Sequence, residues 1–286
     1  MIPHKMWTMN EKDIRLFATD LDGTLFSTLG SPSKYTADIL KRLRAQGVIV
    51  VLSSGRPYYS LSRSVSEDLY DYASCMNGQD IYIPASRKHI RKKELSADDV
   101  NTLRSLFKRY PLIMNAATED KSVYICSPLM SAAYFFRDLP RNVCRFLTKR
   151  PFVHREISSS LKALDGKPAG KICFSGTRKM LQNYADHLDQ ERFSCYFVNS
   201  HWLEVMPAGI SKGNALKEIM TMEGLTSEQC AAIGDGENDI PLLEVCGMKV
   251  AMKNAMPKLA EIADFRAGSC IEDGCAKWIE EHLLKR

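Results

Sequence analysis

Two aspartates separated by one residue follow a short apolar segment near the start of the sequence. Residues 14–18 are mostly apolar, and Asp20 and Asp22 come just after them, followed by Gly23 and Thr24. A short apolar segment closed by Asp-Gly is typical of a buried strand that ends in a sharp turn. Carboxylates at such a strand end could hold Mg²⁺, and one of them could accept a phosphoryl group as a nucleophile. The simpler alternative is a helix cap at Asp20 and an ordinary turn at Asp22.

Three further polar groups stand where predicted elements begin or end. They are Ser54 and Gly55 after the apolar run 48–52, Lys212 at the start of a helix, and Asp235, Asn238 and Asp239 after the apolar run 231–233. Because the carboxyl ends of parallel strands meet at one edge of a sheet, we expect the groups that follow strands to converge there. Phosphoryl transfer needs a metal site, positive charge near the phosphoryl oxygens and an aligned nucleophile. The carboxylates would bind the metal, and a hydroxyl with backbone N–H groups would bind the phosphoryl oxygens. The lysine would provide the positive charge.

Each of these groups also has a simpler explanation. Ser54-Gly55 is compatible with an ordinary turn, and a lysine at a helix start is usually a solvated surface residue. The acidic loop 234–239 resembles a calcium loop, but it lacks the twelve-residue spacing and the terminal glutamate of an EF-hand. The joint occurrence of all four groups in this order favours a phosphoryl-transfer site over the separate explanations.

The elements that would position these groups alternate between strand and helix. The pattern predicts a helix from Ser33 to Gly47, a strand over 48–52, a second helix over 58–69 and a third strand over 73–76. The β-branched run 48–52 is typical of a strand buried on both faces of a parallel sheet. This order of elements predicts a doubly wound α/β unit.

The pattern changes at about residue 81 and changes back at about residue 207. Short alternating segments between these points predict strands at 81–83, 112–114, 123–125, 171–174, 195–198 and 202–205, with helices at 97–109 and 179–188. Such a mixture is typical of an independent α+β domain. We therefore expect a core made of residues 1–82 and 207–286, and an inserted cap of residues 83–206.

Strands and helices alternate again in the last third of the chain. Ser211 and Gly224 are suitable caps for a helix over 212–223. The remaining elements expected there are a strand at 231–233, a strand at 249–252 and a final helix over 276–284. The predicted fold class is therefore α/β, a doubly wound Rossmann-like parallel sheet with an inserted α+β cap.

Composition narrows the class of protein. The 286 residues are 45% hydrophobic and carry a net charge of +5, which is too little basicity for a nucleic-acid binder. No apolar run approaches the ~18 residues of a membrane helix, and residues 1–13 lack an apolar signal core, so we expect a cytoplasmic protein with no membrane partner. The nine cysteines form no Cys-x-x-Cys pair, which predicts reduced thiols and no zinc site.

Taken together, the motifs resemble those of the haloacid dehalogenase superfamily of phosphohydrolases. The four segments similar to its motifs are Asp20-Leu21-Asp22-Gly23-Thr24, Ser54-Gly55-Arg56-Pro57, Lys212 within Ser-Lys-Gly, and residues 234–239. Ser54 stands where threonine is more usual. The position of the insertion, with Asn77-Gly78 before it and Asn254-Ala255 near the end, is similar to the Cof-type IIB subclass, although Gln79 replaces its usual alanine. That subclass carries a large α+β cap over the active site.

The resemblance implies a role for each motif residue. Asp20 would be the nucleophile that forms an aspartyl-phosphate, and Asp22 the general acid and then the base. The phosphate-binding residues would be Ser54, Gly55, Lys212 and Asn238, and the Mg²⁺ site would comprise Asp20, the backbone carbonyl of Asp22, Asp235 and, in support, Asp239.

The activity that we expect from the resemblance is Mg²⁺-dependent hydrolysis of a small phosphate monoester, a sugar phosphate in particular. One alternative is a phosphomutase or phosphotransferase of the phosphomannomutase type, and another is a non-catalytic sugar-phosphate sensor. The expected partner is a small phosphorylated metabolite, and the chain is expected to be a monomer or a small homo-oligomer. The basic run 87–93 is predicted to form a solvated hairpin of the cap, with attraction of phosphorylated substrates as the alternative.

Overall fold

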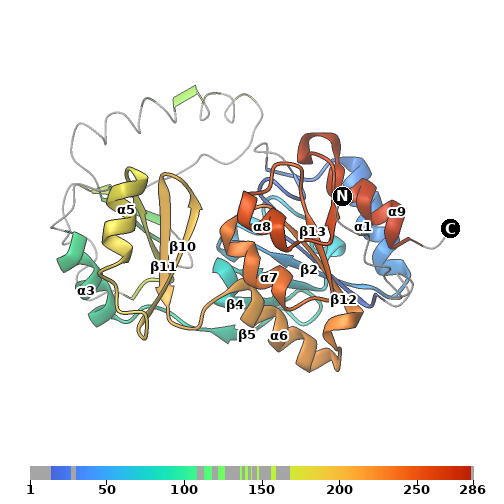
Figure 1. The fold of residues 1–286 in the computed structure, drawn as a ribbon, viewed down its shortest axis with the longest axis horizontal. Helices are drawn as coiled ribbons and strands as arrows, with labels where there is room; N and C mark the ends of the chain where they lie inside the picture. Colours follow the sequence, from blue (N-terminus) through green and yellow to red (C-terminus); the bar gives the residue numbers. More distant parts are fainter. Residues whose placement is uncertain are drawn as a thin grey trace. The chain divides into compact units, whose positions relative to one another are not determined.

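The computed structural model describes most of the chain as two compact units. The described residues are 14–26, 30–107, 113–117, 122–125, 156–158 and 168–284, with the single positions Phe136, Leu139, Pro140, Val143 and Leu147. The first unit consists of residues 1–92 and 209–286, and the second of residues 93–208 (Figure 1). Residues 1–13, which lack an apolar signal core, lie outside the described residues.

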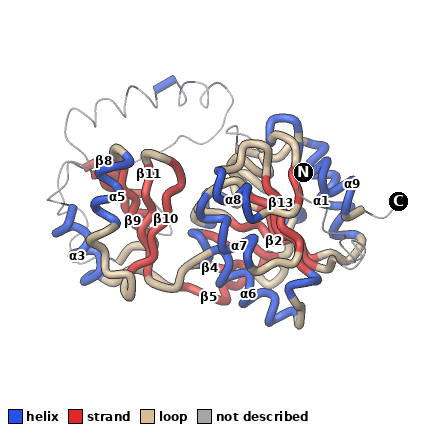
Figure 2. Tube along the Cα trace, viewed as in Figure 1, coloured by secondary structure: helices blue, strands red, loops and turns tan. Residues whose placement is uncertain are grey.

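The described part of the first unit contains one eight-stranded sheet. Its strands are, in spatial order, β14 (Phe265–Arg266), β13 (Met248–Ala251), β12 (Cys230–Gly234), β1 (Leu16–Thr19), β2 (Ile49–Ser53), β3 (Tyr72–Cys75), β4 (Asp80–Ile83) and β5 (Lys88–Lys92). The strands from β14 to β3 run parallel, whereas β4 and β5 form an antiparallel edge. Figure 2 shows these strands as the central layer of the unit. The predicted doubly wound α/β core is confirmed.

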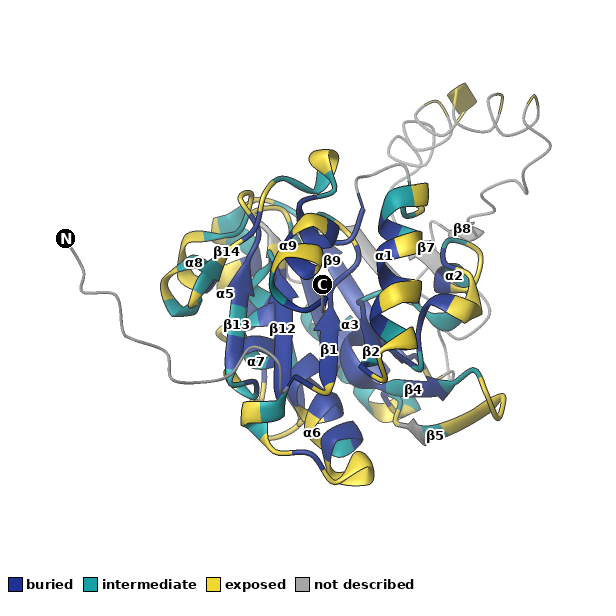
Figure 3. Ribbon diagram, turned by 90° about the vertical axis from the view of Figure 1, so that its right-hand side faces the viewer, coloured by how far each residue is buried: buried dark blue, intermediate teal, exposed yellow. Residues whose placement is uncertain are grey.

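Helices cover both faces of this sheet. Those on one face are α1 (Lys34–Ala45) and α9 (Gly274–His282), and those on the other are α6 (Lys212–Glu223), α7 (Ile240–Glu244) and α8 (Pro257–Ile262) (Figure 1). Successive side chains of a strand point to opposite faces, so Phe17 of β1 meets Trp278 of α9 at 6.4 Å between ring centroids, whereas Leu16 packs with Leu216 of α6. The strands are therefore apolar on both sides, and they form the buried layer in Figure 3.

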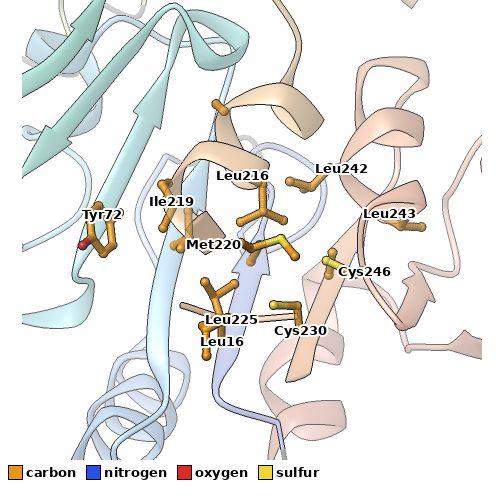
Figure 4. Close-up of a cluster of buried hydrophobic side chains, with 14 of the residues drawn as sticks. Leu16, Tyr72, Leu216, Ile219, Met220, Leu225, Cys230, Leu242, Leu243 and Cys246 are labelled. Atoms are coloured by element: carbon orange, nitrogen blue, oxygen red, sulfur yellow. The ribbon is translucent and has the colours of Figure 1, made fainter. Parts of the chain in front are cut away.

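A buried apolar cluster of the first unit lies between the sheet and helices α6 to α8. Figure 4 shows Leu216 and Ile219 of α6 and Leu242 and Leu243 of α7 gathered near Leu16 of β1. These five side chains are at most 1% exposed. Burial of aliphatic side chains of this size stabilises the fold by about 1.5–3 kcal/mol each, so this cluster fixes α6 and α7 against the strands.

Helix α6 confirms the predicted span 212–223 and both of its caps. The hydroxyl of Ser211 accepts a hydrogen bond from the backbone N–H of Asn214 at 3.0 Å, and Gly224 adopts φ +64°. Near the helix start, a Cβ atom on Gly213 would come within 2.2 Å of the carbonyl oxygen of Pro241. Glycine is therefore required for α6 to approach α7, and this approach places Lys212 at the end of the sheet.

The order of the strands reverses at β1. The chain passes from β1 outward through β2 and β3, and it later returns to β12 on the opposite side of β1. The segments that follow β1 and β12 are therefore neighbours, and Asp20 N–H donates to the carbonyl of Ile233 at 3.1 Å. Open α/β sheets bind ligands at such a switch point, beyond the carboxyl ends of the strands.

Two segments of the first unit differ from the prediction. The helix predicted over 58–69 is only one turn long, α2 (Tyr58–Leu61), followed by a separate 3₁₀ turn at Glu67–Leu69. The hydroxyl of Ser64 donates to the carbonyl of Ser60 at 3.3 Å, and the chain bends to bury Val65. Serines compete for backbone groups in this way, which weakens a helix that the apolar pattern alone would favour.

The basic run 87–93 also differs from the prediction, because most of it forms β5 at the edge of the first sheet. Tyr82 of β4 is paired with His89 of β5, so this hairpin belongs to the core sheet and not to the cap. The division between the units accordingly falls at 92/93 and 208/209, rather than at the predicted 82/83 and 206/207. Alternating residues indicate a hairpin, but they do not indicate which sheet it joins.

The described part of the second unit contains a six-stranded, mostly antiparallel sheet. Its strands are, in spatial order, β10 (Phe193–Asn199), β11 (Trp202–Pro207), β9 (Lys171–Ser175), β6 (Ile113–Ala117), β7 (Ser122–Ile125) and β8 (Glu156–Ser158). Helices α3 (Ala97–Phe107) and α5 (Arg178–Ala185) pack on one face, where Leu103, Phe174 and Tyr184 are buried together. The predicted helix end at 108–109 and the strand start at 112 lie outside the described residues.

No helix in the parts of the chain that the structure describes is long and apolar enough to cross a membrane.

Candidate active site

A buried lysine joins two aspartates at the switch point of the first sheet. Lys212 Nζ lies 2.6 Å from Asp20 Oδ1 and 2.6 Å from Asp239 Oδ1. Asp20 follows β1, Asp239 lies in the loop after β12, and Lys212 is 1% exposed. The predicted convergence of the groups that follow β1 and β12 is therefore observed, and Lys212 is not the solvated surface lysine of the simpler explanation.

The charges in this cluster shift one another's pKa values. Burial raises the pKa of Asp20 well above its usual 3.8, and the carboxylate of Asp239 raises it further, while the ammonium of Lys212 opposes the rise. Burial alone would lower the pKa of Lys212, but its two carboxylate partners raise it above its usual value. Lys212 is therefore a permanent cation that holds Asp20 and Asp239 in place.

A third carboxylate completes an acidic cluster. One oxygen each from Asp20, Asp235 and Asp239 lie within 4.8 Å of one another. Burial and the charge of Asp239 raise the pKa of Asp235 to about 6. Three carboxylates around one ammonium leave an excess of negative charge in a poorly solvated place, and a hard divalent cation such as Mg²⁺ would neutralise it. The donor set therefore fits the predicted metal.

The loop after β12 is folded around Asp239. Oδ2 of Asp239 accepts the backbone N–H groups of Asp235 at 3.0 Å and Gly236 at 2.9 Å. A Cβ atom on Gly234 would come within 2.5 Å of the Asp239 Cβ. Asp239 thus shapes the loop with one oxygen and binds Lys212 with the other, and its support of the metal site stays a prediction.

The carboxylate of Asp22 lies apart from the acidic cluster. Its side chain is 48% exposed and forms an ion pair with Arg56, in which Nε donates to Oδ2 at 2.6 Å. The predicted contribution of Asp22 to the metal site is its backbone carbonyl, and that contribution stays a prediction. The side chain instead lies at the solvent-exposed side of the site, next to the turn after β2.

The turn after β2 is held by its own hydrogen bonds. Ser54 is buried, its hydroxyl accepts the N–H of Arg56 at 3.1 Å, and its backbone N–H donates to Ser74 at 2.8 Å. Gly55 lies between Ser54 and Arg56 in this turn. The side chain of Asn238 donates to Asn77 Oδ1 at 3.0 Å, and both residues are buried. The phosphate-binding roles of Ser54, Gly55 and Asn238 stay predictions.

Three residues with clear contacts in the site received no role from the sequence. They are Thr24, whose hydroxyl donates to Asp235, Arg56, which binds Asp22, and Asn254, whose amide donates to Asp235. All three stand inside segments that the resemblance singled out, Thr24 in the first, Arg56 in the second and Asn254 beside Ala255. A polar residue that stands inside such a segment without an assigned role is therefore a candidate for the site, and this criterion would have identified all three.

Comparison with known proteins agrees with this arrangement. Residues 17–279 match the family model of haloacid dehalogenase-like hydrolases. The chain is 28% identical over 288 residues to a Streptococcus pyogenes protein named as an inferred phosphatase, across 95% of this chain and 99% of that protein. It is 26% identical over 279 residues to the Bacillus subtilis phosphatase YitU, across 94% of this chain and 97% of YitU.

The fold is shared with a solved structure of known subclass. A sugar phosphatase of haloacid dehalogenase subclass IIB matches with a TM-score of 0.76 at 19% identity, over 93% of this chain and 98% of that one. At this identity the match shows the fold alone. With the family model spanning the four motifs and both units, the chain belongs to the haloacid dehalogenase-like hydrolases and has the fold of subclass IIB.

Proposed function

We propose that this hydrolase is a Mg²⁺-dependent phosphatase that cleaves small phosphate monoesters through an aspartyl-phosphate on Asp20. The observation that carries the proposal is the buried contact of Lys212 with both Asp20 and Asp239, beside Asp235. A nucleophilic carboxylate, a fixed cation and an oxygen-rich metal site are the parts that phosphoryl transfer requires. The proposal is supported by the position of Asp20, Lys212 and the acidic cluster, which lie together at the switch point of one sheet.

The residues divide the reaction into two displacements. In the first, a carboxylate oxygen of Asp20 forms a bond to phosphorus, the ester P–O bond breaks, and Asp22 gives a proton to the leaving oxygen. In the second, Asp22 takes a proton from water as the water oxygen bonds to phosphorus, and the carboxylate of Asp20 leaves. Lys212 keeps Asp20 aligned in both steps. When bound by Asp20, Asp235 and Asp239, Mg²⁺ would supply charge that screens the phosphoryl oxygens.

The exposure of Asp22 supports its role as the proton carrier. A group that gives a proton to the leaving oxygen and later takes one from water must be reached by both, and the Asp22 side chain is 48% exposed, whereas that of Asp20 is 9% exposed. The buried carboxylate is suited to nucleophilic attack without competing water. The exposed one is suited to general acid and base catalysis.

We propose a phosphorylated sugar or polyol as the substrate class. YitU is named as a phosphatase of 5-amino-6-(5-phospho-D-ribitylamino)uracil, a phosphate monoester on a ribityl chain. We expect the second unit to act as the specificity cap, as in the predicted architecture. A phosphotransferase and a non-catalytic sensor remain as alternatives, but a sensor would not need a nucleophile, an exposed proton carrier and a metal site together.

The proposal is tested by phosphate release from a panel of sugar, polyol and aryl phosphates. Protein treated exhaustively with EDTA should be inactive and should regain turnover with Mg²⁺ but poorly with Ca²⁺, whose geometry is looser and whose bonds are longer. Full activity after chelation would contradict the metal-dependent mechanism. Transfer of the phosphoryl group to a second sugar, without release of phosphate, would support the phosphotransferase instead.

A further inference from the structure

We propose that Asn254 is a positioning residue of the metal site, which fixes the carboxylate of Asp235 for the cation. This inference rests on the proposed function, because it takes Asp235 as a ligand of Mg²⁺. Asn254 Nδ2 donates to Asp235 Oδ2 at 2.9 Å and to the carbonyl oxygen of Gly23 at 3.0 Å. One amide therefore joins the turn after β1 to the acidic loop after β12.

The orientation of this amide is determined by its partners. Both groups that face it, a carboxylate oxygen and a backbone carbonyl, are acceptors, and only the NH₂ group of an asparagine side chain can donate. An aspartate at position 254 would present two acceptors to these acceptors, and an aliphatic residue would present no donor. The contact therefore requires a donor at position 254, although Asn254 is exposed and lies 231 residues from Gly23.

The turn that carries Asn254 is itself bound to the loop that it supports. The backbone N–H of Met256 donates to the carbonyl of Asp235 at 2.8 Å, and that of Met252 donates to the carbonyl of Gly234 at 3.1 Å. The backbone N–H of Ala255 closes the turn onto the carbonyl of Met252 at 3.0 Å. Because the backbone holds Asn254 opposite Asp235, its side chain loses little freedom in making the contact, and the position is preorganised.

The opposite oxygen of Asp235 has a donor of its own. Thr24 Oγ1 donates to Asp235 Oδ1 at 2.9 Å, and a Cβ atom on Gly23 would come within 2.5 Å of Asp235 Oδ2. Thr24, Gly23 and Asn254 thus hold the carboxylate from three sides. A carboxylate has about four lone-pair sites, so one donor on each oxygen leaves sites for a cation.

The type of donor separates Asp235 from the two other carboxylates. Asp20 and Asp239 share the ammonium of Lys212, whereas the hydrogen bonds to Asp235 come from a hydroxyl and an amide, which are neutral. Neutral donors orient a carboxylate without cancelling its charge. Asp235 therefore keeps the negative charge that attracts a metal, and residues that orient a ligand in this way commonly contribute 10–100-fold to metal affinity.

The test is calorimetric titration of Mg²⁺ into metal-stripped protein without substrate, so that binding is measured apart from turnover. Asn254→Ala should raise the Mg²⁺ dissociation constant by about 10–100-fold, and Asn254→Leu, which keeps the branched shape of the side chain but has no donor, should do the same. Thr24→Val should also weaken binding, because it removes the second donor. Lys253→Ala is the matched control, since Lys253 is an exposed residue of the same turn.

The outcomes separate this inference from the proposed function. Thermal unfolding of the metal-free variants checks that they fold. At saturating Mg²⁺, the kcat of Asn254→Leu should approach that of the wild-type protein. A dissociation constant within twofold of the wild-type value in both Asn254 variants would overturn the positioning role while leaving the phosphatase intact. If the wild-type protein binds no Mg²⁺ and is active after chelation, the proposed metal dependence fails instead, and the inference fails with it.

Discussion

Arg56 binds the carboxylate of Asp22 through two of its nitrogens, with Nε at 2.6 Å from Oδ2 and Nη2 in contact with Oδ1. The guanidinium is itself fixed, because Nη1 donates to Ser64 Oγ at 3.1 Å and the group lies 5.3 Å from the ring centroid of Phe26. Bidentate binding sets the direction of the carboxylate. Since Asp22 is half-exposed, the ion pair is screened by solvent and can exchange. Arg56 thus orients the carboxylate of Asp22 without holding it permanently in the ion pair.

Arg56→Ala should therefore impair proton transfer more than phosphate binding. We expect kcat to fall about tenfold for alkyl phosphates, which corresponds to the ~1.5 kcal/mol of a charge-assisted hydrogen bond at the lower end of its range. Aryl phosphates with good leaving groups should be affected less. Arg56→Lys should recover only part of the loss, because an ammonium lacks the planar fork. Equal losses for both substrate types would show that Arg56 acts on the phosphoryl group.

Asp22→Asn should show the same dependence on the leaving group, but more strongly. Loss of a general acid and base costs about 10²–10⁴ in rate, and the loss should shrink for an aryl phosphate that departs without a proton. The measurement is kcat/KM for a series of leaving groups. Asp38→Asn, an exposed residue of α1, is the control and should change nothing. An equal loss of kcat/KM for all leaving groups would contradict the role of Asp22 as the general acid.

The parts of the site that follow strands could be predicted, because position along a parallel sheet determines where they meet. Asp20 and Asp235 each come after a buried strand, and any parallel arrangement brings them to the same edge. The contacts of Asn254 and Arg56 could not be predicted in this way. They depend on which turn faces which across the site, and the sequence pattern within each turn carries no information about its distant partner.

The same distinction applies to the fold. Helix α6 could be predicted to the residue because Ser211 and Gly224, its two caps, act locally. The hairpin of β4 and β5 was assigned to the wrong sheet, although β4 follows β3 closely and pairs with it, because an alternating pattern does not indicate which neighbouring strand a hairpin joins. Strand β14 has only two residues, Phe265–Arg266, and is therefore too short for any periodicity to indicate it.

An ion pair between Arg192 and Asp99 in the second unit should make its stability depend on pH. Although burial of Asp99 acts to raise its pKa, hydrogen bonds from Ser96 and from Arg192 lower it below the usual 3.8. A depressed pKa in the folded state stabilises the protein above the unfolded value, and this contribution is lost as the pH falls through the folded value. Asp99→Asn should therefore lower Tm at pH 7, and the difference should shrink as the pH falls below 3.8 and disappear once it is below the lowered pKa of Asp99. A difference that persisted in acid would rule out the carboxylate charge as its cause.

Removal of a core side chain should destabilise the first unit strongly. Leu243 of α7 is 0% exposed in the apolar cluster of Figure 4. Leu243→Ala should lower the free energy of unfolding by about 2–5 kcal/mol, from lost burial and the cavity left behind. Met222→Ala is the control, because Met222 is 48% exposed on α6 and should matter by less than about 0.5 kcal/mol. Urea denaturation compares the stability of the two variants. Similar midpoints for both would contradict the packing of α7 against the sheet.

The covalent step on Asp20 is the central claim, and it can be measured directly. Asp22→Asn protein keeps the nucleophile but lacks the base for the second displacement, so with an activated aryl phosphate it should accumulate phosphoenzyme. After an acid quench, peptide mass spectrometry should find the phosphoryl group on Asp20, and hydroxylamine should remove it. The same experiment on the double variant Asp20→Asn, Asp22→Asn should find none. Phosphate on any other residue, or label that persists when Asp20 is replaced, would contradict the account.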